Sequence, residues 1–351
     1  MYWIAIILTV VLLSVYCLLI VLYRQWFLRL PLFRIEPNAA PATRFSIIIP
    51  ARDEEENIQS CLQTVLQQHY PADLFEVIVI NDHSTDQTES IIRLLQQEYA
   101  NLQLINLTDH LQGARINAYK KKAIELAIGQ SMGTWIVTTD ADCKVTDHWL
   151  SAMDAYIRAN QPVFIAAPVM FTDDHSFLSV FQLLDFISLQ GITAAAVSAG
   201  YHTMCNGANI AYRKDVFDEV GRFSGIDHIA SGDDMLLMYK INQKYPGRLG
   251  YLFCKEAIVT TAPMPDWESF LNQRIRWASK ADTYRDKTIF WTLALVYAVN
   301  LLLLVLLLIS PFRENGFSCW LLLAGCKTLI ELSLMIPVAR FYRQSRALLW
   351  F

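Results

Sequence analysis

The chain has 351 residues, of which 54% are hydrophobic and 18% are charged, and its formal net charge is −4. This length fits one large domain or two smaller ones. The slightly acidic balance argues against a nucleic-acid-binding function, and the high apolar content predicts membrane-spanning segments. The seven cysteines have no zinc-binding spacing, which favours unpaired thiols in a reducing compartment.

Three long apolar stretches predict membrane spans. Residues 1–23 carry no charge, and at about 1.5 Å per residue they reach roughly 35 Å, enough to cross a bilayer. A signal peptide is the competing interpretation, but the missing basic n-region favours an uncleaved anchor. Residues 288–310 and 317–339 are the other two predicted spans. In the last one, Lys327 and Glu331 lie four residues apart, where a self-neutralising pair is favoured over a lipid- or substrate-facing group.

Basic residues flank the predicted spans asymmetrically. They follow the first span, precede the second and follow the third, whereas the loop between the second and third has only Arg313, beside Glu314. The positive-inside rule therefore predicts an integral inner (plasma) membrane protein with its N-terminus outside and its large middle region in the cytoplasm. Residues 24–44 would be a juxtamembrane linker, and residues 340–351 a basic cytoplasmic tail.

From residue 45 onward, short apolar runs alternate with segments of helical periodicity. Strands are expected at residues 46–49, 77–80, 102–105 and 135–139. Helices are expected between them at residues 54–68, 84–99 and 117–129. This alternation predicts an α/β fold with a mostly parallel, doubly wound sheet.

Acidic residues follow two of these strands. Asp140-Ala141-Asp142 comes after the fourth strand, and Asn81-Asp82 after the second. Such positions border the crevice where open α/β sheets bind ligands, and two carboxylates there suit Mg²⁺ or Mn²⁺. The alternative is a solvated turn or, for Asp82, a helix cap. The sequence has no glycine-rich phosphate loop, so carboxylates and a metal would have to hold a nucleotide.

Four segments in this order resemble the family 2 glycosyltransferases. They are SIIIPARDEEEN from Ser46 to Asn57, VINDHSTD from Val79 to Asp86, Asp140-Ala141-Asp142, and Ser231-Gly232-Asp233-Asp234 followed by Gln273-Arg274-Ile275-Arg276-Trp277. The resemblance covers residues 45 to about 287. It implies a GT-A fold, a divalent metal and a nucleotide-diphospho-sugar donor. A UDP-sugar is the expected donor.

The Gln-x-x-Arg-Trp signature is similar to that of the membrane-associated branch of the family. That branch includes cellulose, hyaluronan and poly-N-acetylglucosamine synthases and ceramide glucosyltransferase. There the signature lies on an interfacial helix, which the resemblance implies here for residues 266–287, after a transferase domain of residues 45–265. The chain departs from the usual pattern in having Asn81, Asp233 and Asp53 where Asp, Glu and Asn are frequent.

The resemblance also implies roles for individual residues. Asp142 would hold the metal with Asp140, which lies near the ribose or the metal, and Asp82 would contact the nucleoside. Asp234 would be the general base. The catalytic set is completed by Asp233, Gln273, Arg276 and Trp277.

Further residues are assigned to the two substrates. Arg276 and Arg274 would reach the departing diphosphate, since arginine matches phosphate geometry. The remaining donor-side residues are Pro50, Arg52 and Glu54. The acceptor-side residues are Asn206, Gly207, Asn209 and Trp277. Lys120-Lys121-Lys122 is expected to be a solvated helix face in preference to a diphosphate contact.

These inferences predict a membrane-bound inverting glycosyltransferase of cell-envelope biosynthesis, with a lipid or saccharide acceptor at the cytoplasmic membrane face. A processive polysaccharide synthase is the alternative. Three spans are few for a polymer channel unless membrane partner subunits supply more. A scaffold with a decayed transferase domain is a remote alternative, against which the presence of Asp142, Asp234 and Arg276 together argues.

Overall fold

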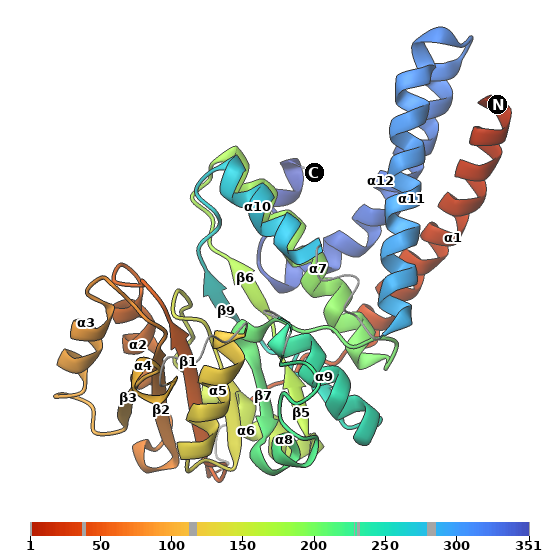
Figure 1. The fold of residues 1–351 in the computed structure, drawn as a ribbon. Coiled ribbons are helices and arrows are strands. Elements are labelled where there is room, and N and C mark those ends of the chain that lie inside the picture. Colours follow the sequence, from red (N-terminus) through yellow and green to blue (C-terminus); the bar gives the residue numbers. More distant parts are fainter. Residues whose placement is uncertain are drawn as a thin grey trace.

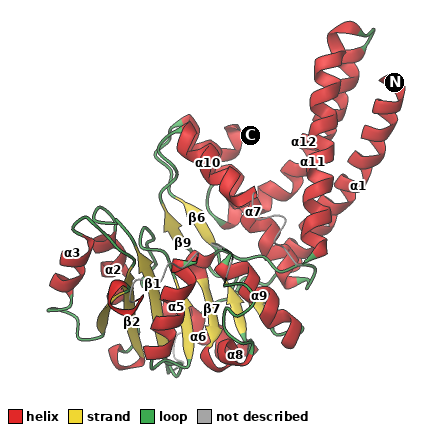
Figure 2. Cartoon of the chain, in the orientation of Figure 1, coloured by secondary structure: helices red, strands yellow, loops and turns green. Residues whose placement is uncertain are grey.

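The computed structural model describes residues 2–36, 40–111, 118–227, 229, 232–278 and 286–350. Ser231 of the fourth motif lies outside the described residues, as do residues 279–285 of the expected interfacial segment. An α/β unit occupies one end of the molecule, and a group of long helices extends from it (Figure 1). Figure 2 shows that the strands lie in and beside this α/β unit, whereas the extended group consists of helices.

A seven-stranded sheet forms the centre of the α/β unit. Its order is β3-β2-β1-β4-β7-β5-β8. The strands are β1 (Phe45–Ala51), β2 (Phe75–Asn81), β3 (Leu102–Asn106), β4 (Trp135–Thr138), β5 (Phe164–Ala166), β7 (Ile210–Arg213) and β8 (Leu249–Tyr251). Only β7 runs antiparallel to its neighbours. The mostly parallel, doubly wound sheet expected from the sequence is therefore confirmed.

The apolar runs of β1 and β2 are buried on both faces, as parallel strands covered by helices must be. The helices of this unit are α2 (Ile58–Leu66), α3 (Thr88–Leu95), α4 (Thr108–Leu111), α5 (Tyr119–Gln130), α6 (Trp149–Asn160), α8 (Lys214–Glu219) and α9 (Asp233–Lys244). Short 3₁₀ turns occur at Ala72–Leu74, Gly207–Asn209 and Lys255–Ala257.

The register brings the ends of the parallel strands to one edge. Ala51 is level with Asn81, and Ile48 is level with Thr138. The segments that follow β1, β2 and β4 therefore emerge together. Both predicted acidic segments, Asn81-Asp82 and Asp140-Ala141-Asp142, lie at this edge, which positions the site.

A second, two-stranded sheet connects the α/β unit to the long helices. It pairs β6 (Val169–Phe171) with β9 (Val259–Thr261) in parallel. Strand β6 leads into α7 (Phe177–Ser198), and β9 leads into α10 (Trp267–Ala278). A bridge between Lys144 and Thr260 ties β9 to the chain just after Asp142.

Four helices in the described part of the chain are long and apolar enough to cross a membrane. Three of them, α1 (Tyr2–Arg29), α11 (Lys287–Ile309) and α12 (Gly316–Phe341), pack on one another and expose most of their surface. The fourth, α7, is mostly buried and contacts α1, α12 and β6. Two 3₁₀ turns, Ser310–Phe312 and Ala347–Trp350, complete this part.

Several observed helices depart from the expected bounds, including α3, which covers only Thr88–Leu95 of the expected residues 84–99. Helix α1 continues to Arg29, beyond the expected end of the first span at residue 23, because Phe27 packs on Phe253 with ring centroids 5.2 Å apart. Helix α2 begins only at Ile58, and not at Glu54. The backbone N–H of Glu54 donates instead to the Thr88 hydroxyl, 2.8 Å away.

Candidate active site

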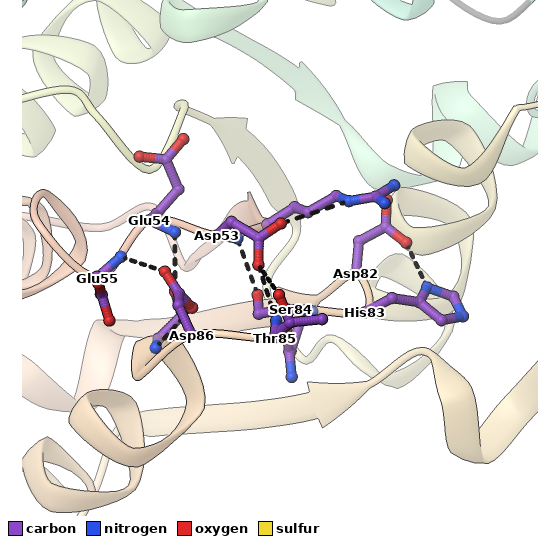
Figure 3. A network of polar contacts seen from close by, with 11 residues as sticks. Asp53, Glu54, Glu55, Asp82, His83, Ser84, Thr85 and Asp86 are labelled. Atoms are coloured by element: carbon purple, nitrogen blue, oxygen red, sulfur yellow. Dashed lines mark hydrogen bonds and ion pairs between the residues drawn. The ribbon is translucent and has the colours of Figure 1, made fainter.

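The loops after β1 and β2 are joined by a network of polar contacts (Figure 3). Asp53 has a positive φ of 53°, and its Oδ1 accepts the backbone N–H of Thr85 at 2.7 Å. The N–H of Glu55 donates to Asp86 Oδ2 at 3.0 Å. Aspartate tolerates this left-handed backbone better than most residues. The carboxylate of Asp53 thus cross-links the two loops, which accounts for a residue whose departure from the family pattern the sequence left unexplained.

Asp82 lies at the end of β2 beside His83. The two side chains approach to 2.7 Å between Asp82 Oδ1 and His83 Nδ1, and the Asp82 N–H donates to Ala51 O at 2.8 Å. The His83 ring in turn packs edge-on against Tyr119. His83, for which the sequence suggested no role, therefore orients the Asp82 carboxylate.

Asn81, by contrast, is turned into the protein. Its side-chain amide donates to Asn106 Oδ1 at 3.0 Å, and its Oδ1 accepts the N–H of Ser84 at 3.1 Å. Both interactions hold the end of the sheet and the loop after β2. Of Asn81 and Asp82, only Asp82 therefore presents a carboxylate at the end of the strand.

Pro50, Arg52 and Glu54 lie at the end of β1 and in the loop that follows. Pro50 pairs in register with Ile80, and Arg52 is exposed, with its Nε 3.9 Å from Asp53 Oδ2. Burial raises the pKa of Glu54; a hydrogen bond from Asn57 opposes the rise, and the nearby carboxylates of Asp142 and Asp140 add to it. Glu54 therefore belongs to the same electrostatic cluster as the two acids after β4.

Asp140, Asp142 and Cys143 offer ligand atoms that lie within 4.8 Å of one another. Asp142 Oδ2 accepts the Thr261 hydroxyl at 3.0 Å. Burial and then the charge of Asp140 raise the pKa of Asp142. Burial also raises the pKa of the Cys143 thiol, so the two carboxylates are the oxygen donors that fit a hard divalent cation.

Lys120 connects the metal-side acids to the start of α9. Its Nζ lies 2.8 Å from Asp140 Oδ1 and 3.9 Å from Asp233 Oδ2. Burial acts to lower the pKa of Lys120, but Asp140 and Asp233 outweigh it and raise the pKa. The Lys120 ammonium group therefore lies between Asp140, at the end of β4, and Asp233, at the start of α9.

The prediction that Lys120-Lys121-Lys122 is a solvated helix face is wrong for Lys121, whereas the side chain of Lys120 is 39% exposed. Lys121 is only 2% exposed, and its Nζ donates to the carbonyl oxygens of Ile226 and Ile229 at 2.8 and 2.6 Å. Lys122 lies on the exposed side, 3.8 Å from Glu125. Three identical residues in a row carry no sequence signal that separates these positions.

Asp234 is positioned by the segment that contains Gly207. Its Oδ2 accepts the Gly207 N–H at 2.8 Å, and its Oδ1 accepts the N–H of Met235 at 2.7 Å. The Gly207 carbonyl in turn accepts the Thr138 hydroxyl at 2.7 Å. One glycine therefore links the end of β4 to the first turn of α9, which carries Asp233 and Asp234.

Asn206 and Asn209 flank this glycine but differ in placement. Asn206 Oδ1 accepts the N–H of Ala208 at 3.0 Å, and its side chain is half-buried. Asn209 is fully buried. Its amide donates to Pro168 O and Ala257 O at 2.8 and 2.7 Å, and its Oδ1 accepts the Trp149 indole N–H at 3.0 Å. Contrary to expectation, Asn209 braces the core and offers no polar atom to an acceptor.

Helix α10 carries the Gln-x-x-Arg-Trp residues and packs on α7. The guanidinium of Arg274 lies 2.5 Å from Asp185 Oδ2 in α7 and over the rings of Phe270 and Trp277, at 4.8 and 4.3 Å. Arg274 is therefore engaged with α7, which does not fit the expected diphosphate contact.

The other signature residues occupy different sides of α10. Gln273 is buried, with an Oε1 that has no hydrogen-bond partner, whereas Arg276 is exposed. Trp277 packs near Phe186 of α7, with ring centroids 6.2 Å apart. Among the signature residues, Arg276 is thus the basic group on the open side of the helix.

Comparison with known families identifies the family and the fold. Residues 46–221 match the model of glycosyl transferase family 2, and residues 135–341 match that of glycosyl transferase family group 2. Among solved structures, a mannosyltransferase from Pyrobaculum calidifontis in complex with GDP-Man and Mn²⁺ has a TM-score of 0.68 at 19% identity. The alignment covers 100% of this chain and 97% of that one, so the overall fold is shared.

Two curated relatives are glycosyltransferases by name. Glycosyltransferase AglE of Haloferax volcanii is 30% identical over 190 residues, which cover 54% of this chain and 58% of that protein. The beta-monoglucosyldiacylglycerol synthase of Synechocystis sp. is 23% identical over 330 residues, 85% of this chain and 66% of the relative. The chain thus spans somewhat less than two thirds of the length of these relatives. Together with the family-model matches, these similarities show that the chain belongs to glycosyltransferase family 2.

Proposed function

We propose that this glycosyltransferase transfers a sugar from a UDP-sugar to a membrane lipid in a single inverting displacement at the cytoplasmic face of the membrane. The observation that carries the proposal is the meeting of Asp82, Asp140, Asp142 and Asp234 at one sheet edge, in a chain with three exposed apolar helices. A domain of residues 45–265 would hold the donor. The apolar helices near residues 1–23, 288–310 and 317–339 would span the bilayer, with the N-terminus outside.

The donor would bind along the ends of β1, β2 and β4. Asp82, oriented by His83, can accept a hydrogen bond from the nucleoside. Asp142 and Asp140 would hold Mg²⁺ or Mn²⁺, which when bound supplies Lewis-acid stabilisation of the diphosphate. Lys120 stands beside Asp140 and offers a further positive charge to the leaving phosphates.

The acceptor hydroxyl would be deprotonated by Asp234. Hydrogen bonds from Gly207 and Met235 fix the plane of this carboxylate. A carboxylate at the start of a helix is also stabilised in its ionised form by the helix dipole. A single displacement needs a base but no covalent nucleophile, so Asp234 would act as the base and no residue would form a covalent intermediate with the sugar.

The acceptor is proposed to come from the membrane. Helix α10 exposes Trp267, Leu271 and Ile275, an apolar surface suited to lying at the bilayer interface. The name of the Synechocystis relative, which matches 85% of this chain, denotes synthesis of a glycolipid.

A processive synthase is the second candidate. A relative named poly-beta-1,6-N-acetyl-D-glucosamine synthase, from Staphylococcus epidermidis, matches 80% of this chain at 23% identity. The three exposed apolar helices are few for a polymer channel, so this candidate would require membrane partner subunits. The two candidates predict products of very different size.

The test is incubation of membranes containing the protein with labelled UDP-sugars and Mg²⁺ or Mn²⁺, followed by solvent partition. Label in the lipid phase supports the proposal, and label in high-mass polymer supports the synthase. Asp142→Ala should abolish metal-dependent UDP binding. Asp73→Ala should not, because Asp73 lies on the exposed turn before β2, at the opposite end of that strand from Asp82. Absence of both lipid label and UDP release with every donor would contradict the proposal.

A further inference from the structure

A groove with a volume of about 360 Å³ lies between α1, α7, α12 and the C-terminal 3₁₀ turn. This size falls in the range of about 300–1,000 Å³ usual for small-molecule sites. Much of its wall is apolar, with Leu184 and Ile192 from α7 facing Leu334 and Met335 from α12. Two of its walls, α1 and α12, are proposed spans, so the groove would open at membrane level, where an acyl chain is available.

Four oxygen-bearing side chains line the groove among these apolar groups: Tyr16, Asp185, Ser188 and Glu331. The Ser188 hydroxyl donates to the Asp185 carbonyl at 2.7 Å, and the Tyr16 hydroxyl donates to Glu331. Both hydroxyl protons are therefore used within the protein. Towards the groove these four side chains offer lone pairs, which accept hydrogen bonds.

The charges around the groove are balanced. Asp185 is paired with Arg274 of α10 at 2.5 Å, and Glu331 is paired with Lys327 of α12 at 2.6 Å. No lysine or arginine is among the described residues that line the cavity. A phosphate would meet two carboxylates and no unpaired cation there, which is an unfavourable environment for an anion.

The contact between Asp185 and Arg274 is an ion pair without hydrogen-bond alignment. Asp185 Oδ2 and the three guanidinium nitrogens are buried and have no hydrogen-bond partner. Oδ2 is buried against Arg274, but the Asp185 side chain as a whole is 39% exposed, so its other oxygen can accept a hydrogen bond from a ligand in the groove. This residue also marks where the groove meets α10, the helix that carries Gln273, Arg276 and Trp277.

We propose that the groove binds a neutral, hydroxyl-bearing glycerolipid, of which diacylglycerol is the simplest, as the acceptor, and that it discriminates against lipid phosphates. One acyl chain lies along α7 between α1 and α12. The single lipid hydroxyl donates to Asp185 while the lipid is held in the groove, and it leaves Asp185 when the head of the lipid enters the active site, where Asp234 takes its proton. This inference rests on the proposed function and narrows its acceptor class.

The first test compares acceptors with the unaltered full-length protein in nanodiscs. Radiolabelled UDP-sugar is supplied with dioleoylglycerol, with a polyprenyl phosphate, or with neither. The expected result is a labelled glycolipid with dioleoylglycerol and no inhibition by the polyprenyl phosphate. Transfer to the polyprenyl phosphate in preference to dioleoylglycerol would overturn the inference and leave the proposed function standing. Absence of transfer to any lipid would contradict both.

The second test changes the groove. Ile192→Trp fills its apolar part and should raise the KM for dioleoylglycerol by about tenfold without a comparable change in the KM for the donor. The matched control is Leu304→Trp on the exposed surface of α11. Equal acceptor KM values for the two variants would show that the lipid binds elsewhere.

The third test changes the charge. Asp185→Asn leaves Arg274 without its counter-ion, so the variant should lose affinity for dioleoylglycerol by about tenfold and become inhibited by the polyprenyl phosphate. Glu268→Gln, an exposed acid on α10, is the matched control. Unchanged lipid selectivity in Asp185→Asn would contradict the role of this carboxylate.

Discussion

The ammonium group of Lys120 lies 2.8 Å from a carboxylate oxygen of Asp140 and thereby joins the first turn of α5 to the end of β4. The same nitrogen is 3.9 Å from Asp233. The carboxylates of Asp140 and Asp233 would repel each other in the absence of the donor and metal, and Lys120 reduces this repulsion. When the donor diphosphate enters, the same cation is available to the developing negative charge.

We therefore expect Lys120→Met to lower kcat/KM by about a hundredfold or more, the magnitude usual for loss of one preorganised group that stabilises transition-state charge. Lys122→Met is the matched control. Lys122 is exposed, and its ion pair among the described residues is with the surface acid Glu125. Steady-state kinetics with varied donor concentration measure both variants. Equal activity in the two would assign Lys120 a purely structural role.

Asp234→Asn should abolish sugar transfer while UDP and Mn²⁺ still bind. Asparagine keeps the shape that accepts the Gly207 N–H, but it cannot take up the proton of the acceptor hydroxyl. Calorimetry measures binding, and product formation measures transfer. Asp218→Asn, which removes an exposed acid paired with Arg222, should leave both intact. Parallel loss of binding and transfer in Asp234→Asn would refute the assignment as base.

The carboxylates of the site could be predicted from the sequence because their position depends on a simple pattern. An apolar run predicts a buried parallel strand, and the residues after it must emerge at the ligand-binding edge. Asp82, Asp140 and Asp142 satisfy this rule. The antiparallel placement of β7 and the pairing of β5 with β8 depend on long-range contacts, for which the short runs gave no indication.

Residues whose role depends on a partner in another helix could not be predicted. The sequence led us to expect that Arg274 contacts the diphosphate, but its environment is set by Asp185, which lies 89 positions earlier in the chain. Lys120 and Lys121 likewise have partners beyond α5 that no periodicity reveals. Sequence patterns report the residue type and the face of an element, whereas the partner is fixed by the tertiary packing.

Asn209→Ala should destabilise the protein, whereas Asn206→Ala should have a smaller effect. Removal of the Asn209 amide takes one hydrogen bond from each of two buried carbonyls, of which Pro168 O keeps the Val259 N–H, and one from the Trp149 indole, at a cost of about 2–5 kcal/mol in the free energy of unfolding. Thermal unfolding in detergent measures the difference. A stable Asn209→Ala protein with a raised acceptor KM would instead restore the acceptor-side role expected from the sequence.

The buried His202 should make the protein sensitive to acid. Its Nε2 lies 3.1 Å from the Tyr23 hydroxyl, its Nδ1 has no hydrogen-bond partner, and burial lowers its pKa to about 4 although Asp286 opposes the shift. An unfolded histidine has a pKa of about 6.5, so between these values the unfolded chain binds more protons than the folded one. The stabilisation from the neutral ring is therefore complete above about pH 6.5 and is lost as the pH falls towards about 4.

His202→Gln removes the titrating group but keeps a side chain that can bond Tyr23. The melting temperature of this variant should fall less between about pH 7 and pH 5 than that of the unaltered protein. His175→Gln, an exposed histidine in the turn before α7, is the matched control and should retain the full pH dependence.

Because a charged imidazole at position 202 would have to be accommodated among Tyr23, Tyr201 and Asp286, the same acidification should loosen the junction between α1 and α11. Proteolysis of that junction at the two pH values would detect this, and identical cleavage in His202→Gln and the unaltered protein would contradict it.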